Sequence, residues 1–120
     1  MIFSMPSTRV YLATGCTDMR KAISGLSILV GKHLELDPFS GHYFAFCNHR
    51  KNIIKILYWD RDGYAIWQKR LEEGTFRFPA DGDGGAVITP TELAMMLGGV
   101  EVSQVRRTRR RYSRDLVNCR

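Results

Sequence analysis

The chain has 120 residues, of which 44% are hydrophobic and 25% charged, and its formal net charge is +6. This length suits one packed domain. There is no run of about 18 apolar residues and no secretion signal near the start, so we expect neither a membrane protein nor an exported one. Three cysteines without a C-x-x-C pair indicate free thiols in a reducing, cytoplasmic environment.

The net positive charge of the chain comes entirely from its C-terminal end. Residues 106–120 contain seven arginines and one acid, whereas residues 1–105 contain eleven basic and eleven acidic residues. We therefore expect a globular domain over residues 1–101, followed by a basic and flexible arm over residues 102–120.

The first third of the chain predicts a strand followed by a helix. Residues 9–13 are rich in β-forming side chains. After a capping Thr17 or Asp18, apolar residues recur at helical spacing, which predicts a long helix that ends before Asp37-Pro38. The residues on its apolar face are Met19, Ile23, Leu26, Val30 and Leu34.

Three apolar runs separated by polar turns predict an antiparallel meander. The runs cover residues 42–47, 53–59 and 64–71. The Asp62-Gly63 pair before the third run is a strong hairpin signal, because glycine tolerates positive φ. Apart from Lys55, the second run is apolar on both alternating faces, which predicts that it is the central strand of the three.

The remaining globular segment predicts two short strands and a second helix. The strands are residues 75–78 and 86–88, with a glycine-rich loop at 80–85 between them. Residues 89–92, Thr-Pro-Thr-Glu, have the pattern of a capping box, so a short helix should follow. We expect the α+β class: a single domain in which an antiparallel sheet of about four to six strands packs with a longer N-terminal helix and a short C-terminal helix.

The arginine-rich arm is the strongest functional signal. Each arginine carries a permanent charge and a planar fork that matches phosphate oxygens, and binding releases counterions from nucleic acid. The alternatives are a solubilising tail and an arm that docks on an acidic protein. We expect phosphate contacts from Arg20, Lys21, Lys69, Arg70, Arg77, Arg106, Arg107, Arg109, Arg110, Arg111 and Arg114.

Other basic residues, Arg50, Lys51 and Arg61, lie in the predicted turns, with aromatic residues on the strands beside them. The aromatic residues are Tyr58, Trp59, Tyr64 and Trp67. Such a mixture can stack bases beside phosphate contacts. For the two tryptophans we favour a core position, because large aromatic side chains in paired strands usually pack inward.

Candidate catalytic and metal-binding groups are weak. Asp60 and Asp62 flank a turn residue, where aspartates usually bond their own backbone, although with Glu72 they could form a metal-dependent nuclease site. Residues 81–92 match three acidic positions of a calcium loop, but alanine stands where glycine is needed. The three histidines are too scattered to form a metal site. We expect no catalytic residue, no metal and no cofactor.

Several short blocks of sequence occur in the same order as in a known family. They are Asp18-Met-Arg-Lys21, Asp37-Pro-Phe-Ser-Gly41, Lys55-Ile-Leu-Tyr-Trp-Asp60 with Asp62-Gly63, and Lys69-Arg-Leu-Glu72 followed by Gly74, Phe76 and Pro79. Through these blocks, residues from about 10 to 99 resemble the TnpB accessory proteins of the insertion sequence sixty-six family, the second open reading frame products of these bacterial mobile elements. Ala22-Ile-Ser24 departs from the family pattern, which usually has a glycine or serine, an aromatic and an acidic residue there.

The resemblance implies a cytoplasmic accessory protein of DNA transposition and recombination, acting beside a separate, larger transposase that carries the strand-cutting carboxylates. We expect the chain to bind DNA, non-specifically or at element ends, and to assist that transposase. The alternative is a protein adaptor that binds the transposase without binding DNA, with Ile28 and the loop 80–85 as possible contacts.

Overall fold

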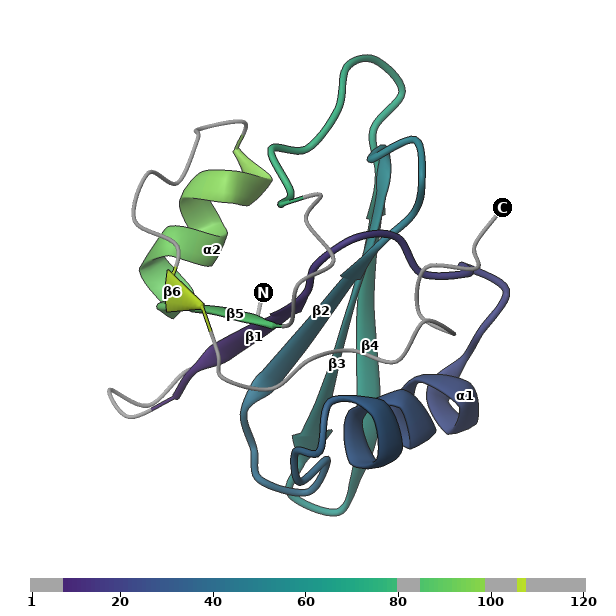
Figure 1. Cartoon of the computed structure of the whole chain (residues 1–120), viewed down its shortest axis with the longest axis vertical. Coiled ribbons are helices and arrows are strands. Elements are labelled where there is room, and N and C mark those ends of the chain that lie inside the picture. Colours follow the sequence, from purple (N-terminus) through teal and green to yellow (C-terminus); the bar gives the residue numbers. More distant parts are fainter. Residues whose placement is uncertain (1–7, 80–84, 99–105, 108–120) are drawn as a thin grey trace.

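The computed structural model describes residues 8–79, 85–98 and 106–107, which form six strands and two helical segments (Figure 1). The elements are β1 (Val10–Ala13), α1 (Ile23–Ile28) continued by the π-helical η1 (Leu29–His33), β2 (Tyr43–Cys47), β3 (Ile53–Asp60), β4 (Gly63–Arg70), β5 (Ala86–Ile88), α2 (Pro90–Leu97) and β6 (Arg106–Arg107). The expected single domain of the α+β class is confirmed.

The six strands form one sheet in the order β4-β3-β2-β1-β5-β6. β2, β3 and β4 are the antiparallel meander that the sequence predicts, with β3 between its two neighbours. β1, however, is parallel to β2, so the expectation of a wholly antiparallel sheet is wrong at this pair. The helical segment between β1 and β2 carries the chain back along the sheet, and β2 therefore starts at the same end as β1.

β2 is buried on both faces and separates two apolar clusters. Tyr43, Ala45 and Cys47 belong to one cluster, and the alternate residues Phe44 and Phe46 belong to the other. This alternation follows from the period of two in a strand. Each face of the sheet therefore needs its own cover.

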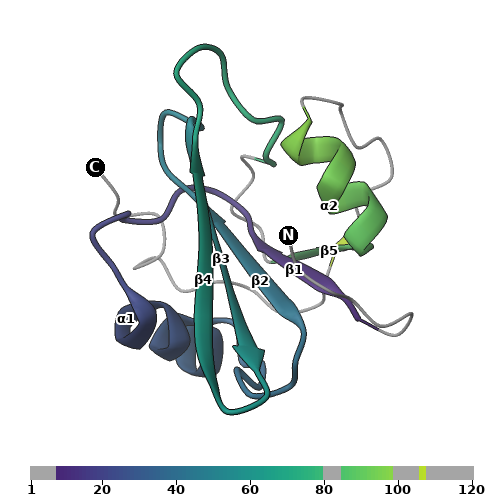
Figure 2. The same ribbon diagram turned by 180° about the vertical axis from the view of Figure 1, so that it is seen from behind.

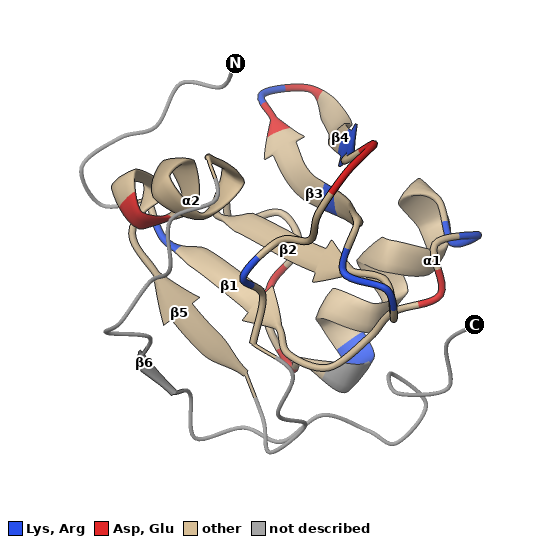
Figure 3. Cartoon of the chain, turned by 90° about the horizontal axis from the view of Figure 1, so that it is seen from above, with Lys and Arg blue, Asp and Glu red and all other residues tan. Residues whose placement is uncertain are grey.

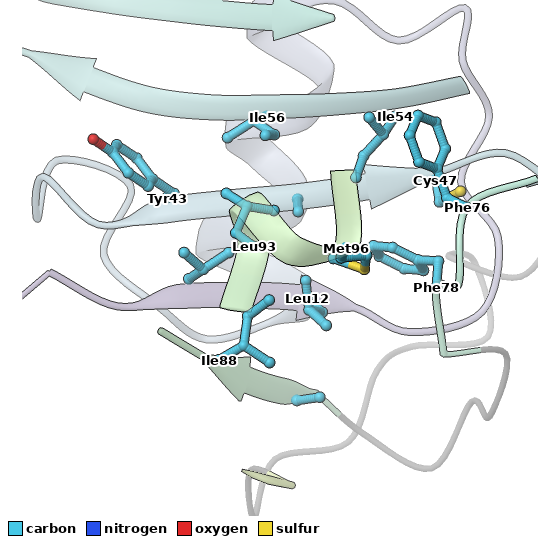
Figure 4. Close-up of a cluster of buried hydrophobic side chains, with 13 residues drawn as sticks. Leu12, Tyr43, Cys47, Ile54, Ile56, Phe76, Phe78, Ile88, Leu93 and Met96 are labelled. Atoms are coloured by element: carbon cyan, nitrogen blue, oxygen red, sulfur yellow. The ribbon is translucent and has the colours of Figure 1, made fainter. Parts of the chain in front are cut away.

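The two helical segments supply these covers on opposite faces of the sheet (Figures 1 and 2). Leu26 of α1 and Leu29 and Val30 of η1 pack in the cluster around Phe44 and Phe46. α2 packs Leu93 and Met96 into the other cluster. Phe76 and Phe78, from the segment after β4, complete that second cluster, as Figure 4 shows.

Four local expectations are wrong. The first helix begins at Ile23 and not near Thr17, and its α-helical part has six residues against eight in α2, so it is not the longer α-helix. Ile23 is 39% exposed and is not a core residue. Residues 75–78 form no strand; their alternation reflects the burial of two phenylalanines against the sheet without strand pairing.

The two described cysteines differ in their bonding. Cys47 is a free thiol, buried in the cluster beneath α2. Cys16 is disulfide-bonded, so the expectation of a free thiol is wrong at that position.

The start of α2 gives a stability prediction. The Thr89 hydroxyl accepts a hydrogen bond from Glu92 N at 3.1 Å, and Thr89 N donates one to Glu92 Oε1 at 2.9 Å, so the expected capping box is confirmed. Thr89→Ala removes this cap and should lower the free energy of unfolding by about 1 kcal/mol, measured by urea denaturation. The exposed Thr91 has no capping role, so Thr91→Ala should leave stability nearly unchanged. Equal losses in the two variants would contradict the cap.

Candidate nucleic-acid interface

Basic side chains gather at one end of the sheet, here called the basic end. It consists of the loop 14–22, the β2–β3 turn 48–52 and the segment 68–77, and Figure 3 looks onto it. These segments contain seven basic and three acidic residues, a formal excess of four positive charges. The basic residues are Arg20, Lys21, Arg50, Lys51, Lys69, Arg70 and Arg77, and the acidic ones are Asp18, Glu72 and Glu73.

The β2–β3 turn is the centre of the basic end. The Asn48 side chain shapes the turn, since its Oδ1 accepts hydrogen bonds from the backbone N–H groups of Asn52 and Ile53, each at 3.0 Å. The Lys51 carbonyl accepts a hydrogen bond from Phe76 N at 2.7 Å, and the Asn52 carbonyl accepts one from Leu71 N at 2.8 Å. The turn therefore lies beside the end of β4 and the segment that follows it.

Lys55 holds the loop 14–22 in place from β3. Its Nζ donates to the carbonyl oxygens of Met19, at 2.8 Å, and Lys21, at 2.9 Å. A second anchor lies earlier in the loop, where Thr17 N donates to the Cys47 carbonyl at 2.8 Å. In the sequence, Lys55 is the one charged residue in the otherwise apolar run 53–59. That position alone hinted that it anchors the loop.

The charge of Arg20 is compensated within the loop. Its guanidinium binds the Asp18 carboxylate through Nη2 at 2.6 Å and through Nε at 3.0 Å to each oxygen. These hydrogen bonds hold the pKa of Asp18 far below its usual value and raise that of Arg20. The Arg20 side chain is 71% exposed, but a phosphate would have to compete with Asp18 for it.

The other cations of the basic end also differ in whether a carboxylate pairs with them. Arg70 pairs with Glu72 at 3.2 Å, but both side chains are largely exposed and such a pair is weak. Lys69, Arg77 and Arg50 are exposed and form no ion pair among the described residues. Arg50 and Lys51 belong to the basic end, although they were not among the residues expected to contact phosphate.

Two of the tail arginines belong to the sheet. Arg106 and Arg107 form β6, which pairs antiparallel with β5 at the opposite edge of the sheet from β4. The other tail arginines expected to contact phosphate, Arg109, Arg110, Arg111 and Arg114, lie outside the described residues.

The aromatic residues are not presented among these cations. Trp67 and Tyr58 are half-buried against the apolar cluster beneath α2. Trp59 is also half-buried and packs edge-to-face on Tyr64 and Phe39, with ring centroids 5.1 Å apart in both pairs. Trp59, Tyr64 and Phe39 lie near the β3–β4 turn, at the opposite end of these strands from the basic end. Base stacking on the sheet therefore gains no support.

Asp60 and Asp62 lie far from Glu72, the third acidic residue considered for a nuclease site. β4 has eight residues, about 26 Å at the usual rise, and separates Asp60 and Asp62 from Glu72. The described residues include no group of three or more His, Cys, Asp or Glu side chains that could hold a metal ion. Asp81 and Asp83 of the calcium-loop pattern lie outside the described residues. No described helix is long and apolar enough to cross a membrane.

Burial also makes Cys47 a poor nucleophile. Desolvation raises the pKa of its thiol to about 12, so the unreactive protonated form dominates at neutral pH. We predict that iodoacetamide leaves Cys47 unmodified in the native protein and alkylates it after denaturation, as measured by mass spectrometry of its peptide. Rapid alkylation of the native protein would show that the thiol is accessible.

The contact of Lys55 with the loop predicts a loss of stability when its ammonium is removed. Lys55→Met keeps much of the side-chain volume but leaves two carbonyl groups without their donor, so the free energy of unfolding should fall by about 1–3 kcal/mol in urea denaturation. Lys69→Met is the matched control, because it removes the same charge from an exposed position. If both variants lose equal stability, charge and not the anchoring contact is responsible.

Comparison with known proteins gives relatives over most of the chain. Two proteins of Sinorhizobium fredii, y4hO and y4jC, both described as uncharacterized, are 34% identical over 101 residues and 35% identical over 107 residues. These alignments cover 84% and 89% of this chain, and 88% and 92% of the relatives. No solved structure matches. A family model described as IS66 Orf2 like protein matches residues 8–107, which confirms the resemblance seen in the sequence blocks, and the chain therefore belongs to the IS66 Orf2-like family.

Proposed function

We propose that this chain is an accessory protein of DNA transposition that binds DNA phosphates at its basic end and assists a separate transposase. Membership of the IS66 Orf2-like family supports a role in transposition. The observation that carries the DNA-binding part is the convergence of seven cations, from three separate segments, on one end of the sheet. The work of such a protein lies in the bacterial cytoplasm, where the element's DNA is.

The described cations rank by how free they are to meet phosphate. Arg50, Lys69 and Arg77 are exposed and unpaired among the described residues, so they are the principal contacts in this proposal. Arg20 and Arg70 already have carboxylate partners and contribute less. Exposed cations without a carboxylate partner suit the phosphate backbone, which positions a protein without reading sequence. We therefore propose binding with little sequence preference.

The opposite end of the molecule favours one orientation on DNA. There the segment 35–41 meets the β3–β4 turn 60–63 through contacts of Phe39 with Trp59 and Tyr64. These two segments, here called the acidic end, contain four acidic residues and one basic residue. Phosphate repels this end and attracts the other, so the charge distribution turns the basic end towards the duplex.

A second candidate function is a protein adaptor that binds the transposase without binding DNA. Ile28 of α1 is 52% exposed, and an isolated exposed apolar side chain of this kind can serve as a partner contact. The other contact expected for an adaptor was the loop 80–85, of which residues 80–84 lie outside the described residues.

The DNA-binding proposal predicts a strong and salt-dependent effect of three substitutions. The variant Arg50→Gln/Lys69→Gln/Arg77→Gln should bind duplex DNA at least about tenfold more weakly at moderate salt, because three phosphate contacts are lost. The slope of the logarithm of affinity against the logarithm of salt concentration should fall in magnitude by roughly 2.7. Fluorescence anisotropy over a series of salt concentrations, with element-end and unrelated duplexes, measures both quantities.

The control variant, Arg9→Gln/Lys32→Gln/Arg61→Gln, removes three exposed cations that lie outside the basic end. Its net charge equals that of the test variant, so only position differs. Equal weakening of both would make binding a matter of total charge and would defeat the basic end as an interface. A chain ending at Gln104 tests the arm: if truncation alone abolishes binding, the arm carries it, and if the intact chain binds no DNA, the adaptor role is favoured.

A further inference from the structure

The edge of the sheet formed by β4 has no strand partner among the described residues. β4 is the last strand in the sheet order, with β3 on one side only. It is eight residues long, and an exposed edge of this length usually pairs, is covered or is blocked by charge. Its middle, Tyr64 to Trp67, has no charged side chain, and the two cations stand at its end, Lys69 and Arg70.

The pairing of β4 with β3 shows which backbone groups are left over. Arg70 lies opposite Ile53, and Leu71 N donates to the Asn52 carbonyl at 2.8 Å. In an antiparallel pair, hydrogen-bonded and non-bonded positions alternate, so the odd-numbered residues of β4 turn their N–H and C=O groups towards β3. The even-numbered residues, Tyr64, Ile66, Gln68 and Arg70, turn theirs outward, away from the sheet.

We propose that a second copy of this chain pairs with this edge, with the two β4 strands antiparallel about a two-fold axis at Ile66. Ile66 then lies opposite its own copy, and Tyr64 lies opposite Gln68 of the second chain. About six backbone hydrogen bonds join the two sheets into one. The surface is isologous, as a closed dimer requires. This inference does not depend on the proposed function.

Charge complementarity selects a second copy in this orientation. β4 runs from the acidic end, with Asp60 and Asp62 in the turn before it, to the basic end, with Lys69 and Arg70. Antiparallel self-pairing at Ile66 brings Arg70 of each chain opposite Asp62 of the other, twice in the dimer. Parallel pairing would instead place cations against cations. Arg70 can change partners at small cost, because its present pair with Glu72 is exposed.

Apolar side chains beside the edge support the same surface. On the face covered by α1, Tyr64 and Ile66 are half-buried. Ser27 of α1 lies beside Tyr64, so this side of α1 faces β4. Ile23, one turn earlier on the same side of the helix, is 39% exposed, and Phe39, which packs on Tyr64, is 58% exposed. A two-fold axis perpendicular to the sheet places both α1 helices on one face, where these exposed residues approach their copies.

Analytical ultracentrifugation of the full chain, freed of nucleic acid, tests the proposal. The expected result is a dimer with twice the chain mass of 13.7 kDa. Gln68→Pro removes one outward N–H, which β3 does not use, and proline is tolerated at such an edge position. It should weaken the dimer at least about tenfold, as two symmetry-related hydrogen bonds are lost. Gln68→Thr keeps the N–H and should remain dimeric.

A charge exchange tests the register. Arg70→Asp and Asp62→Arg should each weaken the dimer, and the double variant should restore it because the opposite charges still face each other. Far-ultraviolet circular dichroism and urea denaturation check that every variant is folded. A wild-type monomer at all concentrations, an undiminished dimer in folded Gln68→Pro, or no restoration in the double variant would each overturn the proposal. Because mass is measured without DNA, none of these results bears on DNA binding.

Discussion

The burial of β2 on both faces is the constraint on which the rest of the structure depends. A strand whose every residue is buried must have a neighbour on each side and a cover above and below. The neighbours are β1 and β3, and the covers are the α1–η1 helical segment on one face and α2 with Phe76 and Phe78 on the other. With both faces of the sheet covered, the parts of the described sheet itself that are left for partners are the two ends of the strands and the sheet edges.

This arrangement explains why charge sorts to the ends. Turns at the strand ends are where polar residues cost least, and the chain fills one end with cations and the other with carboxylates. The pairs Asp18–Arg20 and Arg70–Glu72 then reduce the number of cations that are free to act from seven to five. Of these five, Arg50, Lys69 and Arg77 are exposed, and Lys21 and Lys51 are half-buried. A count of charged residues in the sequence cannot make this distinction, because it depends on which side chains meet.

The parts of the fold that follow from local pattern could be predicted, and those that follow from distant contacts could not. The meander and the capping box of α2 depend on alternation and on residues three positions apart, and both were predicted. The parallel pairing of β1, by contrast, depends on the path of an intervening helix. The predicted start of that helix failed because the loop before it is held by Cys47 and Lys55, far away in the sequence.

The residues of the candidate site also divide into those that local sequence predicts and those that only distant contacts bring together. Lys69, Arg70 and Arg77 could be named from the sequence, because charge on a strand end or loop is visible there. That the turn at Arg50 and Lys51 lies beside them depends on the Phe76–Lys51 backbone contact, which no local pattern indicates. The separation of Asp62 from Glu72 could have been inferred from the strand length alone, since β4 as predicted already spans most of the distance between them.

The hydrogen bonds made by Lys55 constrain the identity of the donor residue but not that of the acceptor residues. The acceptors are main-chain carbonyl oxygens, which every amino acid possesses, so the identities of residues 19 and 21 are not fixed by these bonds. The donor must combine a long side chain with a terminal amine, a combination that only lysine offers in this form. Among descendants of this sequence, drift can therefore change the loop's side chains while the strand position stays lysine, and the loop can acquire new surface chemistry without losing its place on the sheet.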